Sequence, residues 1–123
     1  MLITIHGRFA GLNEFISALN SRNRNVGNRF KKQIEREILN QIDGQIERLT
    51  PPVWMNYSYY EPNRKRDKDN ISIFRKFFQD ALVKGGYLEN DGWAYIEGWT
   101  DSFAVDAKNP RIEIEIIENY RKD

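Results

Sequence analysis

The chain has 123 residues, 40% of them hydrophobic, which is enough for one core, so we expect a single domain spanning residues 1–123. It contains no cysteine, which excludes disulfide frameworks, thiolate zinc sites and cysteine nucleophiles. The net charge of +1 indicates no particular partner. No apolar run reaches the roughly 18 residues of a membrane-spanning helix, and the first residues lack a signal-peptide pattern. We therefore expect a cytoplasmic protein without membrane contact.

The first half of the chain predicts a strand, a short helix and a long helix. Residues 2–6 alternate between apolar and polar side chains and predict a strand. A short helix is expected to start at Leu12. Between residues 26 and 49 apolar side chains recur every four residues, which predicts an amphipathic helix. Gly44 is a candidate end or bend, and Pro51-Pro52 closes the helix because proline cannot donate to the helical ladder.

A further strand and helix follow. Residues 53–60 are rich in aromatic side chains and predict a strand. One face of this strand would carry Val53, Met55, Tyr57 and Tyr59. A second helix is predicted from about residue 70 to residue 84, and Gly85-Gly86 supplies a left-handed C-cap. We expect about half of the strand's aromatic side chains to lie in the core; the others are candidates for stacking on unpaired bases.

The last part of the chain predicts two more strands. Asn90-Asp91-Gly92 is a turn signal, and residues 93–103 and 111–117 read as strands. The predicted fold is therefore an α+β domain with a mixed sheet of about four strands and two main helices packed on it.

Basic residues gather in two places on this nearly neutral chain. One group comprises Arg22, Arg24, Arg29, Lys31 and Lys32. The other comprises Arg64, Lys65, Arg66 and Lys68. Such patches are typical of a surface that binds a polyanion. The alternative is a pair of solvated faces, and the patches alone do not favour one interpretation over the other.

Acidic residues lie where a loop enters the second predicted helix, in the run Arg66-Asp67-Lys68-Asp69-Asn70. Two carboxylates at i and i+2 point to opposite sides unless the chain bends, and the turn into the helix supplies a bend. The structural alternative makes Asp69 an N-cap, Asp67 a loop acid paired with a basic neighbour, and Asp91 an ordinary turn residue.

A metal site requires these acids to meet. The helix runs away from Asp67 and Asp69, so Asp91 must return along a neighbouring element, which is possible if the following strand runs antiparallel to the helix. Three converging carboxylates repel one another, and Mg²⁺ relieves the repulsion because it prefers carboxylate oxygens. Such a site polarises a phosphodiester and activates water, while basic neighbours hold the flanking phosphates. We therefore predict a Mg²⁺ site at Asp67, Asp69 and Asp91, with Mn²⁺ as a substitute.

An ordered set of motifs resembles the RusA-type Holliday junction resolvases, which are often carried by phages and prophages. The set is Arg66-Asp67-Lys68-Asp69-Asn70-Ile71, Lys76, Asp80-Ala81-Leu82-Val83-Lys84-Gly85-Gly86-Tyr87-Leu88 and Asn90-Asp91. Its continuation, Gly92-Trp93, Gly98-Trp99-Thr100-Asp101-x-Phe103 and Asn109-Pro110-Arg111-Ile112-Glu113, is similar to the phage-associated branch. The resemblance covers roughly residues 62–117.

The resemblance implies a RusA-like domain in which Asp67, Asp69 and Asp91 bind the metal and Lys76 is the family's catalytic lysine. The segment between Asp69 and Lys76 is about one turn longer than the family pattern. Seven helical residues place Lys76 about 10 Å from Asp69. Contact with a DNA phosphate and pairing with Asp80 are the alternatives for Lys76.

The implied function is Mg²⁺-dependent hydrolysis of four-way DNA junctions by a homodimer, in DNA recombination and repair. The expected DNA contacts are Arg24, Arg29, Lys31, Lys32, Arg64, Lys65, Arg66 and Lys68. No nucleotide cofactor is expected, because the sequence has no phosphate-binding glycine loop or dinucleotide fingerprint. The alternatives are a non-catalytic DNA-binding protein that keeps the fold and a nuclease for flaps or replication forks.

Overall fold

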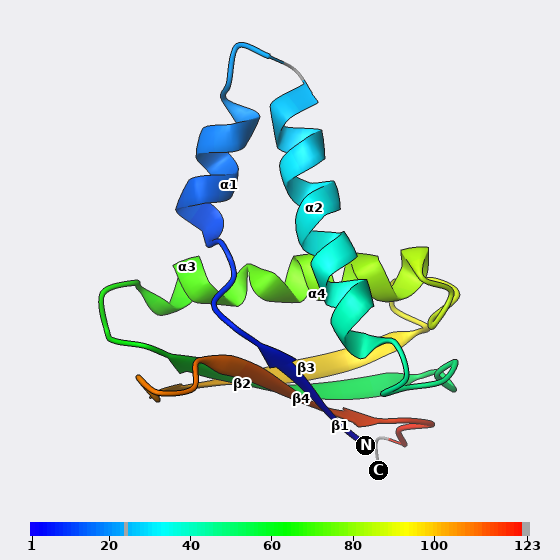
Figure 1. Ribbon diagram of the computed structural model, residues 1–123. Helices are drawn as coiled ribbons and strands as arrows, with labels where there is room; N and C mark the ends of the chain where they lie inside the picture. The colour runs from blue at the N-terminus through cyan, green and yellow to red at the C-terminus, as the bar shows by residue number, and fades with distance from the viewer. Residues whose placement is uncertain (24, 122–123) are drawn as a thin grey trace.

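The computed structural model describes residues 1–23 and 25–121 and shows a mixed four-stranded sheet with helices on one face (Figure 1). The strands are β1 (Leu2–His6), β2 (Val53–Glu61), β3 (Ile96–Val105) and β4 (Arg111–Ile117). Their order in the sheet is β1-β4-β2-β3, with β2 and β3 parallel and the other pairs antiparallel. In the central strand β2, Tyr57 lies between Ile114 of β4 and Asp101 of β3. The predicted α+β fold is confirmed.

The helices form two groups on the covered face of the sheet. They are α1 (Leu12–Leu19), α2 (Asn25–Ile42), α3 (Lys68–Ser72) and α4 (Phe74–Lys84). α3 and α4 follow one another along the sheet, and Ile73 between them keeps right-handed helical angles. α1 and α2 form a hairpin that rises from this layer (Figure 1). No helix in the described ranges is long and apolar enough to cross a membrane.

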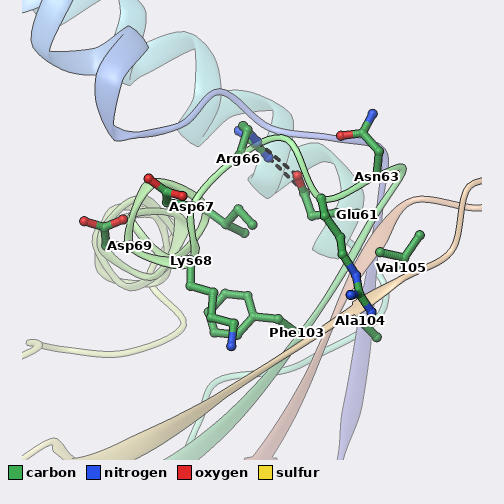
Figure 2. A pocket seen from close by; sticks show the side chains of 11 residues that line it. Glu61, Asn63, Arg66, Asp67, Lys68, Asp69, Phe103, Ala104 and Val105 are labelled. Atoms are coloured by element: carbon green, nitrogen blue, oxygen red, sulfur yellow. Dashed lines mark hydrogen bonds and ion pairs between the residues drawn. The ribbon is translucent and has the colours of Figure 1, made fainter.

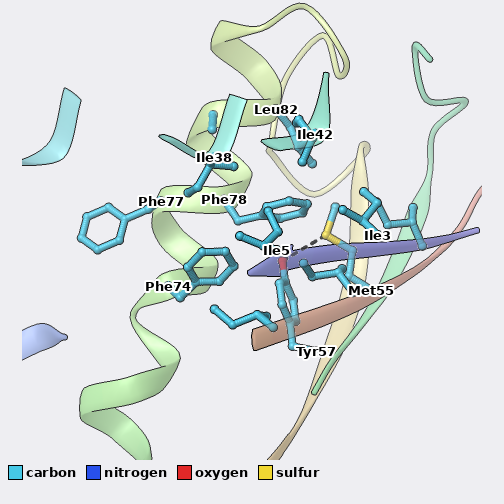
Figure 3. Close-up of a cluster of buried hydrophobic side chains, with 14 of the residues drawn as sticks. Ile3, Ile5, Ile38, Ile42, Met55, Tyr57, Phe74, Phe77, Phe78 and Leu82 are labelled. Carbon is cyan, nitrogen blue, oxygen red and sulfur yellow. Dashed lines mark hydrogen bonds between the residues drawn. The ribbon is translucent and has the colours of Figure 1, made fainter. Parts of the chain in front are cut away.

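The core lies between the sheet and the helices (Figure 3). Alternate residues of β2 are buried, as the aromatic pattern predicts, with Tyr57 and Tyr59 each 1% exposed. From the helices and β1 the core receives Ile38, Ile42, Phe74, Phe78, Ile3 and Ile5. Burying each of these side chains contributes about 1.5–3 kcal/mol. On the other face of β2, the Trp54 ring stacks on the Tyr120 ring, with 5.2 Å between the ring centres. The aromatic side chains of β2 thus divide between its two faces, and the prediction that about half of them lie in the core is confirmed.

α2 ends earlier than its apolar spacing predicts. The helix stops at Ile42, and Gly44 follows in the left-handed region with a φ of 81°. The side chains of Ile46 and Leu49 are still buried, although they come from a non-helical segment. Because buried side chains continue at the helical spacing, the apolar pattern does not show where the helix ends, whereas the candidate end Gly44 lies two residues past it.

β3 begins later than predicted, at Ile96 rather than at residue 93. The residues before it form a turn that leaves Trp93 99% exposed. The pairing of β2 with β3 shifts between Val53 and Trp54, so Glu97 has no partner in the register. β3 is the edge strand next to β2, and only its first residue is fully buried.

Candidate functional site

Two of the predicted acids lie together at the start of α3. Asp67 is the N-cap, with extended backbone angles (φ −69°, ψ 155°), and Lys68 is the first helical residue. Asp69 lies in the first turn, so the backbone bends between the two carboxylates as expected. Both side chains line the same open cavity (Figure 2). The acids sit at the positive end of a helix, although α3 has only five residues.

The cavity has a volume of about 600 Å³ and combines basic, acidic and apolar walls. Arg64 and Lys68 contribute positive charge beside the two acids. Ile71, Phe103 and Val105 contribute apolar surface. The Lys68 ammonium lies 5.7 Å from the centre of the Phe103 ring, and the Lys68 side chain lies beside this part of the apolar wall (Figure 2).

Arg66 differs from the expectation that it contacts DNA. Its guanidinium donates to both carboxylate oxygens of Glu61 at 3.0 and 2.9 Å and to the carbonyl oxygen of Phe9 at 2.8 Å. Only 9% of the Arg66 side chain is exposed. Arg66 therefore holds the loop before α3 against β2 and is not available for a phosphate. The sequence did not single out Glu61, and no local pattern marks it as the partner.

Asn70 anchors α3 to the start of α1. The backbone N–H of Asn13 donates to Asn70 Oδ1 at 2.9 Å. Gly11 lies directly against Asn70, where a Cβ would collide with the Asn70 side chain. The backbone N–H of Asn70 donates to Asp69 Oδ1 at 2.9 Å. Asn70 thus positions the turn that carries the acids, a role that the Asp-Asn pair in the sequence did not reveal.

In the structure of the single chain, Asp91 is not grouped with Asp67 and Asp69. Asp91 lies beside Asp80 of α4 and Lys31 of α2, and it contributes to the lowered pKa of Asp80 and to the raised pKa of Lys31. Asp80 follows Asp69 by eleven residues along nearly continuous helix, which corresponds to about 16 Å. Across the described part of the chain, no three His, Cys, Asp or Glu side chains form a group that could hold a metal ion.

The path of the chain after α4 explains this separation. Gly86 adopts a left-handed φ of 78°, and Leu88, which is 1% exposed, packs into the core beside the end of the helix. Asp91 comes before the chain turns back, and the return along the sheet begins only at Ile96. Figure 1 shows the turn after α4 and the start of α3 at opposite ends of the helix layer.

Asp80 gathers two of the predicted basic residues. Lys31 Nζ lies 2.7 Å from Asp80 Oδ2, and Lys76 Nζ lies 3.6 Å from the same atom. Burial opposes ionisation of Asp80, but the hydrogen bond and charge of Lys31 outweigh it and hold the pKa of Asp80 below its usual value. The hydrogen bond to Asp80 raises the pKa of Lys31 in turn. Of the two alternatives for Lys76, the structure shows pairing with Asp80. Lys31 is also paired with Asp80, which differs from the expectation that it contacts DNA.

The remaining predicted basic residues are exposed. Arg29 and Lys32 line a shallow hollow of about 340 Å³ on α2, together with Gln33 and Arg36. Arg36 was not predicted, although its spacing of seven residues from Arg29 places both on one helix face. Arg64 and Lys65 are exposed on the loop before α3, whereas Arg24 lies outside the described residues.

Comparison of the chain with protein-family models finds no match, and comparison with curated proteins finds none.

Proposed function

We propose that this chain is a Mg²⁺-dependent endodeoxyribonuclease that cuts branched DNA, as its resemblance to RusA-type resolvases implies. The observation that carries the proposal is the pairing of Asp67 and Asp69 in one open cavity with Arg64 and Lys68 at its edge. Acidic oxygens beside basic side chains suit a site that binds a divalent cation and a phosphodiester together.

The residues of the cavity fit Mg²⁺, because its acidic donors are all hard oxygen ligands. When bound, Mg²⁺ supplies Lewis-acid polarisation of the phosphate and lowers the pKa of a water molecule. Asp67 and Asp69 hold the ion, while Arg64 and Lys68 bind the phosphates on either side. Arg29, Lys32 and Arg36 on α2 offer a second positive surface for a duplex arm.

The proposed active form is a homodimer. Asp67 and Asp69 of one chain leave the acidic set without Asp91, which lies beside Asp80, and Asp80 is about 16 Å from Asp69 along the helix axis. A second copy related by a two-fold axis brings its own Asp91 to the first copy's Asp67 and Asp69. Two such sites match the two-fold symmetry of a four-way junction.

Replacement of Asp69 by Asn tests the proposal. We expect Asp69→Asn to abolish Mg²⁺-dependent nicking of a synthetic four-way junction and to leave junction binding intact or tighter, because the variant loses a metal ligand and a negative charge near the phosphates. The control is Asp43→Asn, an exposed acid beyond the end of α2, which should cut like the wild type. Both variants and the wild type are incubated with four-way, flap and linear duplex DNA.

Two outcomes favour the alternatives. If wild type and Asp69→Asn bind the junction equally and neither cuts with Mg²⁺ or Mn²⁺, the chain is a DNA-binding protein without nuclease activity. If the wild type cuts flaps or forks and leaves four-way junctions intact, the chemistry holds and the proposed substrate is wrong.

A further inference from the structure

The aromatic side chains on the open face of the sheet already have partners. The Trp54 ring is stacked on the Tyr120 ring, and the Arg111 guanidinium lies 3.9 Å from the centre of the Tyr60 ring. The same face carries the exposed acid Glu115. Paired rings beside a negative charge do not suit a polyanion, so this face is a poor surface for unpaired bases.

Cations and aromatic rings form a row on the other face of β3, where the strand runs beside α3 and α4. The Lys68 ammonium lies 5.7 Å from the centre of the Phe103 ring (Figure 2), and the Arg75 guanidinium carbon lies 4.9 Å from the centre of the Trp99 ring. Seven residues separate the two cations and four separate the two rings, so each pair shares one face of its own element. Lys68 and Phe103 also line the cavity of about 600 Å³, so this cation–ring row begins at the cavity and ends at Trp99.

Arg75 is held on one side and open on the other. Its Nε lies 3.0 Å from Asp101 Oδ2, and the Tyr59 hydroxyl donates to Asp101 Oδ1 at 3.1 Å. Within residues 1–23 and 25–121, the two terminal nitrogens of Arg75 have no hydrogen-bond partner, and they reach solvent. A guanidinium that is fixed in place with terminal N–H groups to spare suits a phosphate, which accepts two parallel hydrogen bonds.

Trp99 offers surface on which a base can stack. The residue remains 42% exposed although Arg75 lies over its ring. Every base has an aromatic face, so a protein ring binds bases with little regard to sequence. Inside a duplex both faces of a base are covered by its neighbours, so Trp99 can stack only on a base that is unpaired or at a helix end.

The spacing of the row fits one DNA strand. Trp99 and Phe103 are four residues apart on β3, which corresponds to about 13 Å at 3.3 Å per residue. This length equals the rise of about four stacked nucleotides at 3.4 Å each. A phosphate in the cavity and a base on Trp99 can therefore belong to the same strand.

We propose that the cation–ring row binds an unpaired stretch of a DNA strand, with one base stacked on Trp99 and a phosphate on the terminal nitrogens of Arg75. The surface deepens the proposed function, on which it rests for the place of the cleaved phosphate in the cavity. The substrate class is then branched DNA that has unpaired nucleotides within a few positions of the cut. Binding of the strand needs neither metal nor cleavage.

Binding of a single strand in EDTA tests the surface. The probe is a fluorescent oligothymidylate of about 12 nucleotides, and the comparison is an abasic strand of the same length. We expect the wild type to bind oligothymidylate about ten-fold more tightly than the abasic strand, because only the bases can stack. Trp99→Ala should bind both strands alike, whereas Trp99→Phe keeps a ring and should retain part of the preference.

Arg75→Ala tests the phosphate contact. It should weaken binding of both strands about five-fold and lower the salt dependence by about one phosphate contact, because both strands carry phosphates. Two matched controls lie outside the row. Trp93 is 99% exposed in the turn before β3, and the Arg48 side chain is 70% exposed beside Glu89. Trp93→Ala and Arg48→Ala should each bind within about two-fold of the wild type.

Fluorescence of Trp99 reports on stacking directly. The chain has three tryptophans, so Trp54→Phe combined with Trp93→Phe leaves Trp99 as the only one. Oligothymidylate should quench its emission and the abasic strand should not. Circular dichroism checks that each variant keeps the fold of the wild type.

The remaining outcomes are also decisive. A wild type that binds both strands equally, or a Trp99 emission that oligothymidylate leaves unchanged, overturns the inference and leaves Trp99 as a cover for the core or a contact for another protein. Strand binding through Trp99 by a chain that cuts no branched DNA with Mg²⁺ supports the inference and counts against the proposed function. A nuclease whose strand binding and cleavage are unaffected by Trp99→Ala does the reverse.

Discussion

Arg64 and Arg66 are two residues apart, yet their side chains meet different surroundings. Arg66 is held by Glu61 and by the carbonyl oxygen of Phe9, whereas Arg64 is exposed where the cavity opens. A basic run in a sequence does not distinguish these roles, because the partners of Arg66 come from β2 and from the segment before α1. The positive surface charge here therefore comes from Arg64 and Lys65 of the loop and from Lys68 at the start of α3.

We expect Arg66→Ala to destabilise the fold by about 3 kcal/mol, because it leaves the Glu61 carboxylate, 8% exposed, without its bidentate partner. Arg64→Ala should change the unfolding free energy by no more than about 0.5 kcal/mol and should weaken junction binding instead. Urea denaturation and a binding titration separate the two effects. Equal stability of the two variants would contradict the assignment of Arg66 to the scaffold.

At the scale of elements, Lys31 and Asp80 join α2 to α4 across the layer of helices. The lowered pKa of Asp80 means that its ion pair stabilises the fold above the ordinary value of 3.8 and is lost as the pH falls through the folded pKa. The raised pKa of Lys31 means that the same contact is present below 10.5 and is lost as the pH rises through the folded value.

We expect Asp80→Asn to lower the unfolding free energy by about 1 kcal/mol at pH 7, since the pair is partly exposed and screened by solvent. The difference from the wild type should shrink as the pH falls below 3.8, where the wild-type carboxyl also becomes neutral. Urea unfolding at neutral and acidic pH measures both values. A difference that persists unchanged in acid would show that Asp80 acts through packing rather than through its charge.

Most elements could be predicted from the sequence because their side chains alternate or recur with the period of one local structure. β2 shows this best: its predicted buried face, from Val53 to Tyr59, is the observed one. The apolar spacing did not predict the end of α2, because Ile46 and Leu49 continue it after the backbone has left the helix; Gly44, a candidate end, follows the last helical residue by two positions. Local patterns report which side chains are buried, and they do not report which backbone conformation buries them.

At the scale of the whole molecule, the three predicted metal-binding acids lie in two places: Asp67 and Asp69 line one cavity, and Asp91 lies near Asp80. The pairing of Asp67 with Asp69 could be predicted, because it depends on a bend within three residues. The position of Asp91 could not, because it depends on where Gly86 and Leu88 direct the chain after α4. The position of β3 at the edge of the sheet depends on the sheet order, which no local pattern encodes.

The most direct test of a metal site shared between two copies is cleavage by mixed chains. Asp69→Asn and Asp91→Asn homodimers are each expected to be inactive on a four-way junction with Mg²⁺. Unfolding and refolding them together yields mixed dimers, in which one site combines intact Asp67 and Asp69 of one copy with intact Asp91 of the other. The account predicts that nicking returns in the mixture. A mixture as inactive as its parents, although mixed dimers form, would contradict it.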